Sequence, residues 1–418
     1  MKKFICFLIL MSLAGSASYA APSRTFTPWG WPQPYDQVSQ KSIDWLKSKG
    51  YWPLSIAWTG PWSGEDSIAT AMEHLQLLQK RGVEAKYTEY IGGPPINESM
   101  LAGRSQVGFE GNFPFTTLLV KQFPVVDLAV LSPNLLHCVV VPNDSPYKSL
   151  KDWANQKTPL SVGVLIGSSP EFYFQDAARV NGVVIGKDVT LVNMPVADEI
   201  TMPRGIAGVV PWEPTCSFMA DYLKTGRIMD ESYAYSMYEG NYYVTADVVK
   251  NAPDVAQALT DAFMEATLYI RYHPDEVVDW LSVDPMLKHF PKAMLAQQQL
   301  DYNNLYKPTA AYPFPRYWAT ENARIAEFLY KNKTVTRLLT AQDYFVAWDP
   351  HYMDATFKKL GWKVPSTPPW IPKNWPGRIG HPPYPTYYNT STLKKPQPWP
   401  EKGDLTAAWQ FEGKTYQP

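Results

Sequence analysis

Four loops in the sequence contain residue types that suit the binding of a small molecule. They cover residues 59–64, 108–114, 167–170 and 210–214, and each follows an expected strand. Because ligands of parallel α/β sheets bind outside the carboxyl ends of strands, a binding site is expected at such loops. The candidate ligand-binding residues in or beside them are Trp62, Ser63, Glu110, Asn112, Phe113, His137, Ser168, Ser169, Phe172, Trp212 and Glu213.

The loop at residues 167–170 has the sharpest local signal, which is that of an anion site. Ser168 and Ser169 stand at the expected start of a helix, where free backbone amides and the helix dipole favour a negative charge. Ordinary capping by either serine, with Pro170 in the first turn, explains the same residues at least as well. The sequence leaves both interpretations open.

The other candidates also have structural interpretations. Trp62 suits a flat ligand or packing on a neighbouring element, and the two carry equal weight. Asn112 suits a polar contact or the cap of the following helix. Glu213 can accept a hydrogen bond from an amino group of a ligand or pair with a nearby lysine. His137 lies on an apolar strand and is expected to be a satisfied core residue rather than a base.

Motifs for catalysis, metal binding and phosphate binding are missing from the sequence. GxSxG, the Walker loop and GxGxxG do not occur, the histidines have no HxxxH or HxH spacing, and no cysteine lies in a CxxC pair. These absences predict a binding protein rather than an enzyme, without cofactor or metal. A formal net charge of −1 does not suit a nucleic acid partner.

The elements that position these loops alternate between strand and helix. Apolar runs and alternation predict the strands, and apolar residues at the helical period predict the helices. Such an order predicts α/β lobes with mostly parallel, doubly wound sheets. The expected strands are residues 52–58, 83–90, 107–109, 125–130, 135–141, 160–165, 189–193, 206–211 and 242–245. The expected helices are residues 65–80, 95–102, 113–121, 150–155 and 169–181 and a long helix from 253.

Two segments rich in Pro and Trp do not fit this pattern. Residues 22–48 begin with an arm that is expected to lie extended over the surface, because Pro lacks a donor N–H and fixes φ. Residues 349–418 are expected to form an extended wrap, with a disordered appendage as the alternative.

The N-terminus has the pattern of a secretory signal peptide. Two lysines precede a short apolar run, and small residues lead to Ala20, after which cleavage is expected. The expected location of the mature chain is a bacterial periplasm. Cys138 and Cys216 remain after cleavage, and two buried thiols are favoured over a disulfide between them, although the compartment permits one.

Four stretches in the middle of the chain resemble the second lobe of periplasmic solute-binding proteins. They are SLKDW at residues 149–153, LSVGVLIGSSPEFYF from Leu160, GVVIGKDVTLVNMPVADE from Gly182, and IAGVVPWEP ending at Pro214. The helix phrase at residues 244–278 is also similar. The likeness is in particular to the branch that serves nitrate, alkanesulfonate, taurine and thiamine-pyrimidine importers.

This resemblance implies a two-lobed, type II-like periplasmic-binding-protein fold that closes by a hinge around a ligand. Crossovers are implied near residues 132–140 and 215–232, and the partner is an ABC permease in the inner membrane. The stretch after Asp198 departs from the family pattern, and the tail has no counterpart. The implied division is a signal peptide at 1–20, lobe 1 at 21–134 and 223–348, lobe 2 at 135–222, and a Pro/Trp-rich tail at 349–418.

For the ligand, the resemblance implies a small organic anion, either a sulfonate or an aromatic carboxylate. Ser168 and Ser169 would hold its charge, and aromatic side chains would line its apolar body. A thiamine-pyrimidine precursor or related nitrogen heterocycle is the alternative, with Glu110 or Glu213 facing its amino group. A pyrimidine-synthase-like enzyme on the same fold is the competing class, and the expected export and few cysteines argue against it.

Overall fold

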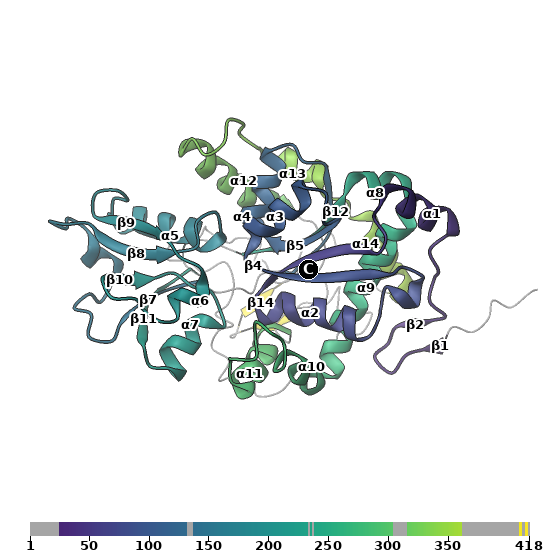
Figure 1. The fold of residues 1–418 in the computed structure, drawn as a ribbon, viewed down its shortest axis with the longest axis horizontal. Helices are drawn as coiled ribbons and strands as arrows, with labels where there is room; N and C mark the ends of the chain where they lie inside the picture. The colour runs from purple at the N-terminus through teal and green to yellow at the C-terminus, as the bar shows by residue number, and fades with distance from the viewer. Residues whose placement is uncertain are drawn as a thin grey trace, which may run out of the picture.

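The computed structural model describes residues 25–131, 137–232, 235, 238–303, 316–361, 409–411 and 414–416. The expected signal peptide and its cleavage site after Ala20 lie outside the described residues, as do residues 362–408 of the expected tail. The described chain forms two lobes that lie side by side, each built on its own five-stranded sheet (Figure 1). This is the α/β, two-lobed fold that the sequence predicts.

The sheet of lobe 1 is formed by β3 (Leu54–Gly60), β4 (Ala85–Ile91), β5 (Val107–Gly111), β6 (Val125–Leu131) and β12 (Gly240–Thr245). The strand order is β4-β3-β5-β12-β6. β3 is parallel to β4 and β5, whereas β12 lies between β5 and β6 and is antiparallel to both. Because β12 is the strand that returns from lobe 2, the two lobes are joined by two chain crossings.

Different helices cover the two faces of this sheet: α2 (Ser63–His74) and α9 (Pro253–Tyr272) on one, and α3 (Gly93–Leu101), α4 (Asn112–Val120) and α13 (Ala341–Ala347) on the other. The neighbouring residues Tyr242 and Tyr243 point to opposite faces, as successive strand residues must. The Tyr242 ring lies 5.0 Å from that of Phe263 on α9. The Tyr243 ring lies 5.1 Å from that of Phe115 on α4.

The sheet of lobe 2 is formed by β7 (Cys138–Pro142), β8 (Leu160–Val164), β9 (Val189–Asn193), β10 (Ile206–Val209) and β11 (Gly226–Glu231). Its order is β11-β7-β10-β8-β9, with β8, β9 and β10 parallel. The helix α5 (Ser169–Val180) follows β8 and buries Phe174 and Ala177 with Trp153 in the core of this lobe. Near-continuous apolar strands such as β7 and β8 suit a sheet that is buried on both faces.

β11 corrects the expected boundary of lobe 2 at residue 222. It pairs antiparallel with β7, from Gly226 opposite Pro142 to Glu231 opposite Cys138, so the chain returns to lobe 1 only after this strand. Its sequence, GRIMDE, hides the strand because it mixes charged residues with few apolar ones. The first crossing, between Leu131 and Cys138, agrees with the expected position.

Most of the expected elements are confirmed within a few residues of their bounds. The expected helix at 65–80 is instead divided, because Gln76 adopts a left-handed φ of 52° between α2 and η1 (Gln79–Arg81). No helix in the described ranges is both long and apolar enough to cross a membrane. The remaining helices are α1 (Gln40–Lys49), η2 (Leu150–Trp153), α6 (Val196–Glu199), α7 (Thr215–Ser217), η3 (Phe218–Tyr222), α8 (Ala246–Asn251), α10 (Pro274–Leu281), α11 (Lys292–Asn303), α12 (Arg316–Lys331) and α14 (His351–Leu360).

The Pro/Trp-rich arm at the N-terminal end runs extended over lobe 1, with two short paired strands, β1 (Thr25–Phe26) and β2 (Pro32–Gln33). Beneath it, Arg81 Nη2 lies 2.6 Å from Glu265 Oε2, and both side chains are buried. Trp29 Nε1 and Tyr35 Oη also donate to Glu265, at 3.0 and 2.9 Å. The arm is therefore anchored on a buried ion pair.

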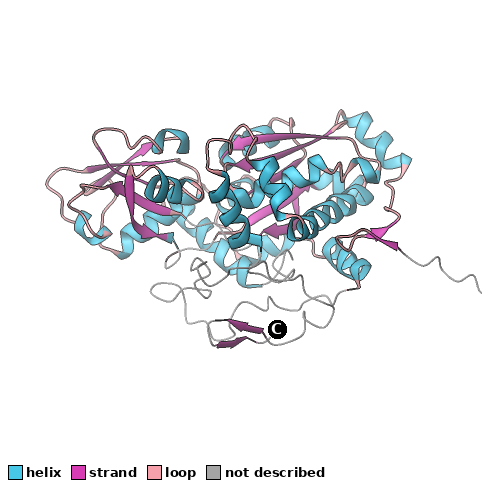
Figure 2. Ribbon diagram, turned by 90° about the horizontal axis from the view of Figure 1, so that it is seen from below, coloured by secondary structure: helices cyan, strands magenta, loops and turns pink. Residues whose placement is uncertain are grey.

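The segment expected to be extended from residue 349 begins instead with a helix, α14. It packs on α9, where Thr356 Oγ1 donates to Asp261 Oδ1 at 2.7 Å and Lys359 pairs with the same carboxylate. Its buried residues Tyr352, Met353 and Phe357 follow the helical period, a short signal within a Pro-rich context. Further along, β13 (Trp409–Phe411) and β14 (Lys414–Tyr416) form a separate pair, seen below the lobes in Figure 2.

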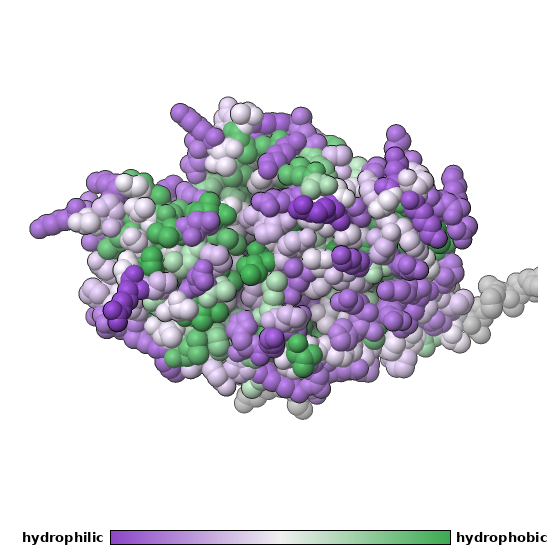
Figure 3. All heavy atoms as spheres, in the orientation of Figure 1, coloured by the Kyte–Doolittle hydropathy of each residue, from purple (hydrophilic) through white to green (hydrophobic). Residues whose placement is uncertain are grey.

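The face of the molecule seen in Figure 3 is unevenly hydrophobic. On this face, hydrophobic residues gather over lobe 2 and its junction with lobe 1, whereas the end of lobe 1 away from lobe 2, at the right of the view, is largely hydrophilic. Exposed apolar side chains in the two lobes include Ile91, Leu101, Ile166 and Val184.

Candidate ligand-binding site

The carboxyl ends of strands from both lobes meet at one junction. Trp212 of lobe 2 donates a hydrogen bond from Nε1 to the carbonyl oxygen of Pro61 in lobe 1, at 2.9 Å. Gly111, at the end of β5, lies so close to Ser169 after β8 that a Cβ atom added to this glycine would be 2.9 Å from Ser169 Oγ. The loops after β5 and β8 are therefore also close together. The structure thus brings the four predicted loops together, and their role in binding stays a prediction.

Trp62 and Tyr238 form the aromatic centre of this junction. Trp62 is fully buried at the start of α2, and its ring meets that of Tyr238 edge to face at 5.1 Å. Tyr238 lies just before β12 in the second crossing, and its ring is also 5.7 Å from His137. Trp62 therefore packs on a neighbouring element, while Ser63 begins α2.

The start of α5 is engaged by groups of its own turn. Ser168 Oγ donates to the carbonyl oxygen of Leu165 at 2.5 Å, and neither serine caps the helix through its side chain. The amide of Gly167 donates to Glu171 Oε2 at 2.7 Å. Because the Glu171 carboxyl occupies an amide of this turn, an anionic ligand at α5 would have to compete with it.

Phe113 and Phe172 join the two lobes through a third aromatic residue. Their rings lie 6.2 Å apart, and Phe328 on α12 lies 6.1 Å from Phe113 and 5.2 Å from Phe172. A hollow of about 290 Å³ borders this group and is also lined by Gly167 and Glu171. The two predicted aromatic residues thus contact each other across α4 and α5.

Asn112 does not cap the helix that it begins. Its Nδ2 donates to Asn322 Oδ1 on α12 at 3.0 Å, and the N-cap position of α4 is taken by Gly111. Asn322 in turn donates to Glu239 at 3.4 Å. The predicted polar contact of Asn112 therefore leads into a buried network from three separate parts of the chain.

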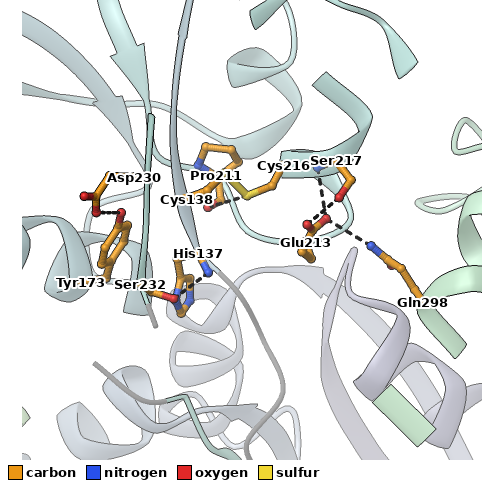
Figure 4. The surroundings of a disulfide bond; sticks show 10 residues. All are labelled: His137, Cys138, Tyr173, Pro211, Glu213, Cys216, Ser217, Asp230, Ser232 and Gln298. Carbon is orange, nitrogen blue, oxygen red and sulfur yellow. Dashed lines mark hydrogen bonds between the residues drawn. A yellow bond between two sulfur atoms is a disulfide. The ribbon is translucent and has the colours of Figure 1, made fainter. Parts of the chain in front are cut away.

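Glu213 is hydrogen-bonded within lobe 2 and to a helix that follows the second crossing (Figure 4). It accepts from Ser217 Oγ at 2.7 Å and from the Ser217 amide at 3.2 Å. Gln298 Nε2 on α11 donates to it at 3.2 Å. Glu213 thus holds α7 and α11 beside the turn that carries Trp212.

Cys138 and Cys216 form a disulfide, contrary to the favoured prediction of two thiols (Figure 4). Their Cα atoms are 6.2 Å apart across a sequence separation of 78 residues. His137 and Trp212 form an antiparallel bridge, and the Cys138 amide donates to the Pro211 carbonyl at 3.2 Å. That register, which single-sequence patterns do not contain, is what places the two cysteines together.

His137 is not the satisfied core residue that the sequence suggests. Its side chain is buried, with its ring stacked 6.1 Å from Tyr173. Neither ring nitrogen has a hydrogen-bond partner among the described residues. Burial lowers the pKa of His137 to about 3, so the imidazole is neutral with one donor and one acceptor unused.

Four buried carboxyl groups lie at or near the lobe 1 side of the junction: Glu65, Glu110, Asp127 and Glu239. Tyr238 Oη donates to Glu65 at 2.8 Å, and Tyr243 Oη donates to Glu110 at 2.7 Å. Asn241 Nδ2 donates to both Asp127 at 2.7 Å and Glu239 at 2.8 Å.

Burial is the main cause of the raised pKa of these four carboxyl groups. It raises the pKa of Glu65 and of Glu239 to about 8, against the opposing effect of their hydrogen bonds. It also raises the pKa of Glu110 and of Asp127 well above the usual range, with Glu65 and Glu239 adding repulsion respectively. In the structure as it stands, these groups are therefore largely protonated near neutral pH.

Of these acids, sequence reasoning found Glu110 and missed the others. Glu65 stands three residues after Trp62, and Glu239 begins a polar run just before the expected strand at 242–245. These positions, beside a predicted site residue and beside an expected strand, are the sequence features that could have indicated the two acids. Among the described residues, no group of three or more His, Cys, Asp and Glu side chains is arranged to hold a metal ion.

Residues 74–277 match a family model described as NMT1/THI5 like. No curated protein sequence matches the chain significantly. The family match agrees with the resemblance found in the sequence, and the solved structures described next share the fold that this resemblance implies.

Three solved structures illustrate that fold. The alkanesulfonate-binding protein SsuA from Xanthomonas axonopodis pv. citri, bound to MOPS, is 14% identical, covers 70% of this chain and 96% of its own, and has a TM-score of 0.58. The periplasmic aliphatic sulphonate binding protein SsuA from Escherichia coli is 21% identical, with coverage of 70% and 98% and a TM-score of 0.57. The periplasmic nitrate-binding protein NrtA from Synechocystis PCC 6803 is 13% identical, with coverage of 73% and 88% and a TM-score of 0.61.

Proposed function

We propose that this protein is the periplasmic substrate-binding component of an ABC importer, which captures a small organic molecule between its lobes and delivers it to a membrane permease. The observation that carries the proposal is the junction at which Trp212 of lobe 2 bonds to Pro61 of lobe 1 beside Trp62, Ser169 and Tyr238. The match of residues 74–277 to the family model supports it.

Capture by hinge closure fits the way the chain crosses between lobes. It crosses once between Leu131 and Cys138 and once between Glu231 and Gly240, so two short connections join the sheets. Rotation about such connections can part the loops at the junction without disturbing either sheet. The disulfide between Cys138 and Cys216 suits the oxidising periplasm to which the expected signal peptide directs the chain.

Two ligand classes follow from the sequence, and different features support them. The small organic anion, a sulfonate or an aromatic carboxylate, is supported by Ser168 and Ser169 at the start of α5 and is opposed by Glu171 in the same turn. A nitrogen heterocycle related to the thiamine pyrimidine is supported by Glu110, one of whose oxygens has no partner among the described residues. The buried acids favour the second class.

The test is thermal unfolding of the mature chain, residues 21–418, against sulfonates, aromatic carboxylates, amines, amino-pyrimidines and nitrate. A ligand at a hundred times its dissociation constant stabilises the folded state by about 2.7 kcal/mol, which raises the melting temperature visibly. A dose-dependent rise with one class, and recovery of that compound unchanged, would support a binding protein over an enzyme. No rise with any class would overturn the proposed function.

A further inference from the structure

Three buried carboxyl groups interact electrostatically with Tyr238 at the junction, and one of them, Glu65, accepts a hydrogen bond from its hydroxyl. Glu65 comes from the first turn of α2, Glu110 from the end of β5, and Glu239 from the residue before β12. All three are 0% exposed, and all three raise the pKa of Tyr238 by their proximity, after its own burial. These three carboxyl groups are here called the Tyr238 acid cluster.

Hydrogen bonds within the chain satisfy this cluster only in part. Glu110 Oε1 accepts from Tyr243, and Glu239 Oε1 accepts from Asn241. Glu110 Oε2 and Glu239 Oε2 are buried and have no partner among the described residues. A buried polar oxygen without a partner is costly, so these carboxyl groups favour a ligand that supplies donors once they ionise.

Basic side chains do not neutralise the cluster within the described part of the chain. The groups that perturb Glu65, Glu110 and Glu239 are Tyr238, Tyr243, Thr59, Asn241, Asn322 and the other acids. The buried guanidinium of Arg81 is committed to Glu265, and Arg324 pairs with Asp176. The charge that three carboxylates would develop therefore has no counterpart among these groups.

A non-acidic side chain beside Tyr238 also has unused hydrogen-bonding groups. His137, at the first crossing, lies beside Tyr238 with the two rings 5.7 Å apart, and both its nitrogens lack partners among the described residues. The Trp62 ring lies 5.1 Å from Tyr238 on another side. Carboxylates beside aromatic faces are the usual surroundings of an organic cation, because both are attracted to positive charge.

We propose that the Tyr238 acid cluster recognises the positively charged nitrogen of an organic cation, such as a protonated amine or an amidinium, that the protein encloses between its lobes. This inference rests on the proposed function and deepens it by naming the substrate class. Glu110 and Glu239 supply carboxyl oxygens that accept hydrogen bonds when ionised, and Trp62 and Tyr238 supply the aromatic faces. The lobes must part to admit the cation, since the three carboxyls are fully buried.

Binding of such a ligand is coupled to proton release. Burial raises the pKa of Glu65 and Glu239 to about 8, and a bound cation favours the ionised form of a facing carboxyl. Below pH 8, affinity therefore rises with pH, by about tenfold per pH unit for each proton released. His137 does not oppose this trend above pH 6, because burial keeps it neutral.

The first experiment compares probes that share one ring and differ in charge. Isothermal titration calorimetry of the wild-type chain uses benzylamine and benzamidine as cations, benzyl alcohol as the neutral control, and benzenesulfonate and benzoate as anions. We expect both cations to bind more tightly than the alcohol, and to bind more tightly at pH 8 than at pH 6. Because binding releases protons, the measured binding enthalpy should also differ between phosphate buffer and Tris buffer.

The outcomes separate this inference from the proposed function. Binding of an anion without binding of either cation overturns the inference and leaves the substrate-binding role intact. If none of the five probes binds, the inference is overturned. The substrate-binding role is then decided by the thermal unfolding measurements with the wider set of compounds. Cation binding that does not change with pH overturns the proton coupling and, with it, the involvement of the cluster.

The second experiment removes one charge at a time with little change of shape. Glu110→Gln and Glu239→Gln should each weaken benzylamine binding at pH 8 by tenfold or more and flatten its pH dependence. Glu84→Gln, at an exposed position before β4, is the matched control and should bind benzylamine as the wild type does. Unchanged affinity in both cluster variants, with a wild-type melting temperature, contradicts the inference.

Discussion

Trp212 joins the two lobes through one hydrogen bond and a packed ring. Its indole Nε1 donates to the Pro61 carbonyl, and the side chain is buried in a small cluster with Trp62, Val196 and Tyr238. A tryptophan suits this place because it buries a large apolar area and still offers a donor in a fixed direction. The side chain therefore resists separation of the lobes at the point where they must part.

Trp212→Phe should shift the ligand-free protein towards an open arrangement. The substitution keeps an aromatic ring but leaves the Pro61 carbonyl without its donor, at a cost of about 1 kcal/mol, or roughly a fivefold change in the ratio of open to closed forms. Small-angle X-ray scattering should report a larger radius of gyration. Trp45→Phe on α1, far from the junction, is the control, and an equal radius in Trp212→Phe and wild type would refute the prediction.

At the scale of residues, the sequence predicts the loops of the site better than the contacts within it. Trp62, Glu110, Ser169 and Trp212 are found because each lies at or just after the expected end of a strand. Tyr238 and its contacts are not, because its partner Glu65 lies 173 residues away in the chain and only the folded register joins them. The orphaned nitrogens of His137 are likewise a property of burial, which a single sequence does not encode.

Among the secondary-structure elements, helices and strands with strong hydrophobic periodicity are predicted correctly, and those without it are missed. β9 and α5 are recovered at or near their bounds because Val189–Asn193 and Ser169–Val180 have clear apolar patterns. β11 and α14 are missed because one is rich in charge and the other lies in a Pro/Trp-rich context. In both cases, packing against a neighbouring element decides the conformation.

The disulfide should be the main covalent support of lobe 2. It links the first residue of β7 to α7 and encloses a loop of 78 residues that contains β8, β9 and β10. The chain-entropy model gives a contribution of roughly 4 kcal/mol for a loop of this size. Replacing both Cys138 and Cys216 by Ser should lower the free energy of unfolding by about that amount, measured by denaturant titration.

The reductant response provides the control for this prediction. A reducing agent should destabilise the wild type to the level of the double-serine variant and should leave that variant unchanged. If the wild type keeps its unfolding midpoint while mass spectrometry detects two free thiols, the bond contributes nothing to stability.

At the scale of the whole molecule, buried titratable groups link folding to pH. Glu65 and Glu239 at the junction and Glu89 on β4 have their pKa raised to about 8, chiefly by burial. A raised carboxyl pKa means that the folded state binds a proton that the unfolded state releases above its ordinary pKa of 4.5. The stability from these groups is complete below about pH 4.5 and is lost as the pH rises through 8.

His137 acts in the opposite direction over a lower range of pH. Because burial lowers its pKa from 6.5 to about 3, the unfolded state binds the extra proton, and the stability from this residue is lost as the pH falls below 6.5. Well above pH 6.5, the contribution of His137 no longer changes, whereas the buried carboxyl groups still titrate. The net effect is therefore clearest between pH 6.5 and 8.

The ligand-free protein should consequently lose stability as the pH rises from 6.5 to 8. Each of the three carboxyls contributes a slope of up to about 1.4 kcal/mol per pH unit, and urea unfolding at several pH values measures the sum. Glu65→Gln should reduce the slope by removing one titrating group, whereas the exposed Glu84→Gln should leave it unchanged. A stability that stays level or increases over this range would contradict the prediction, because the buried carboxyls would then already be ionised in the folded chain.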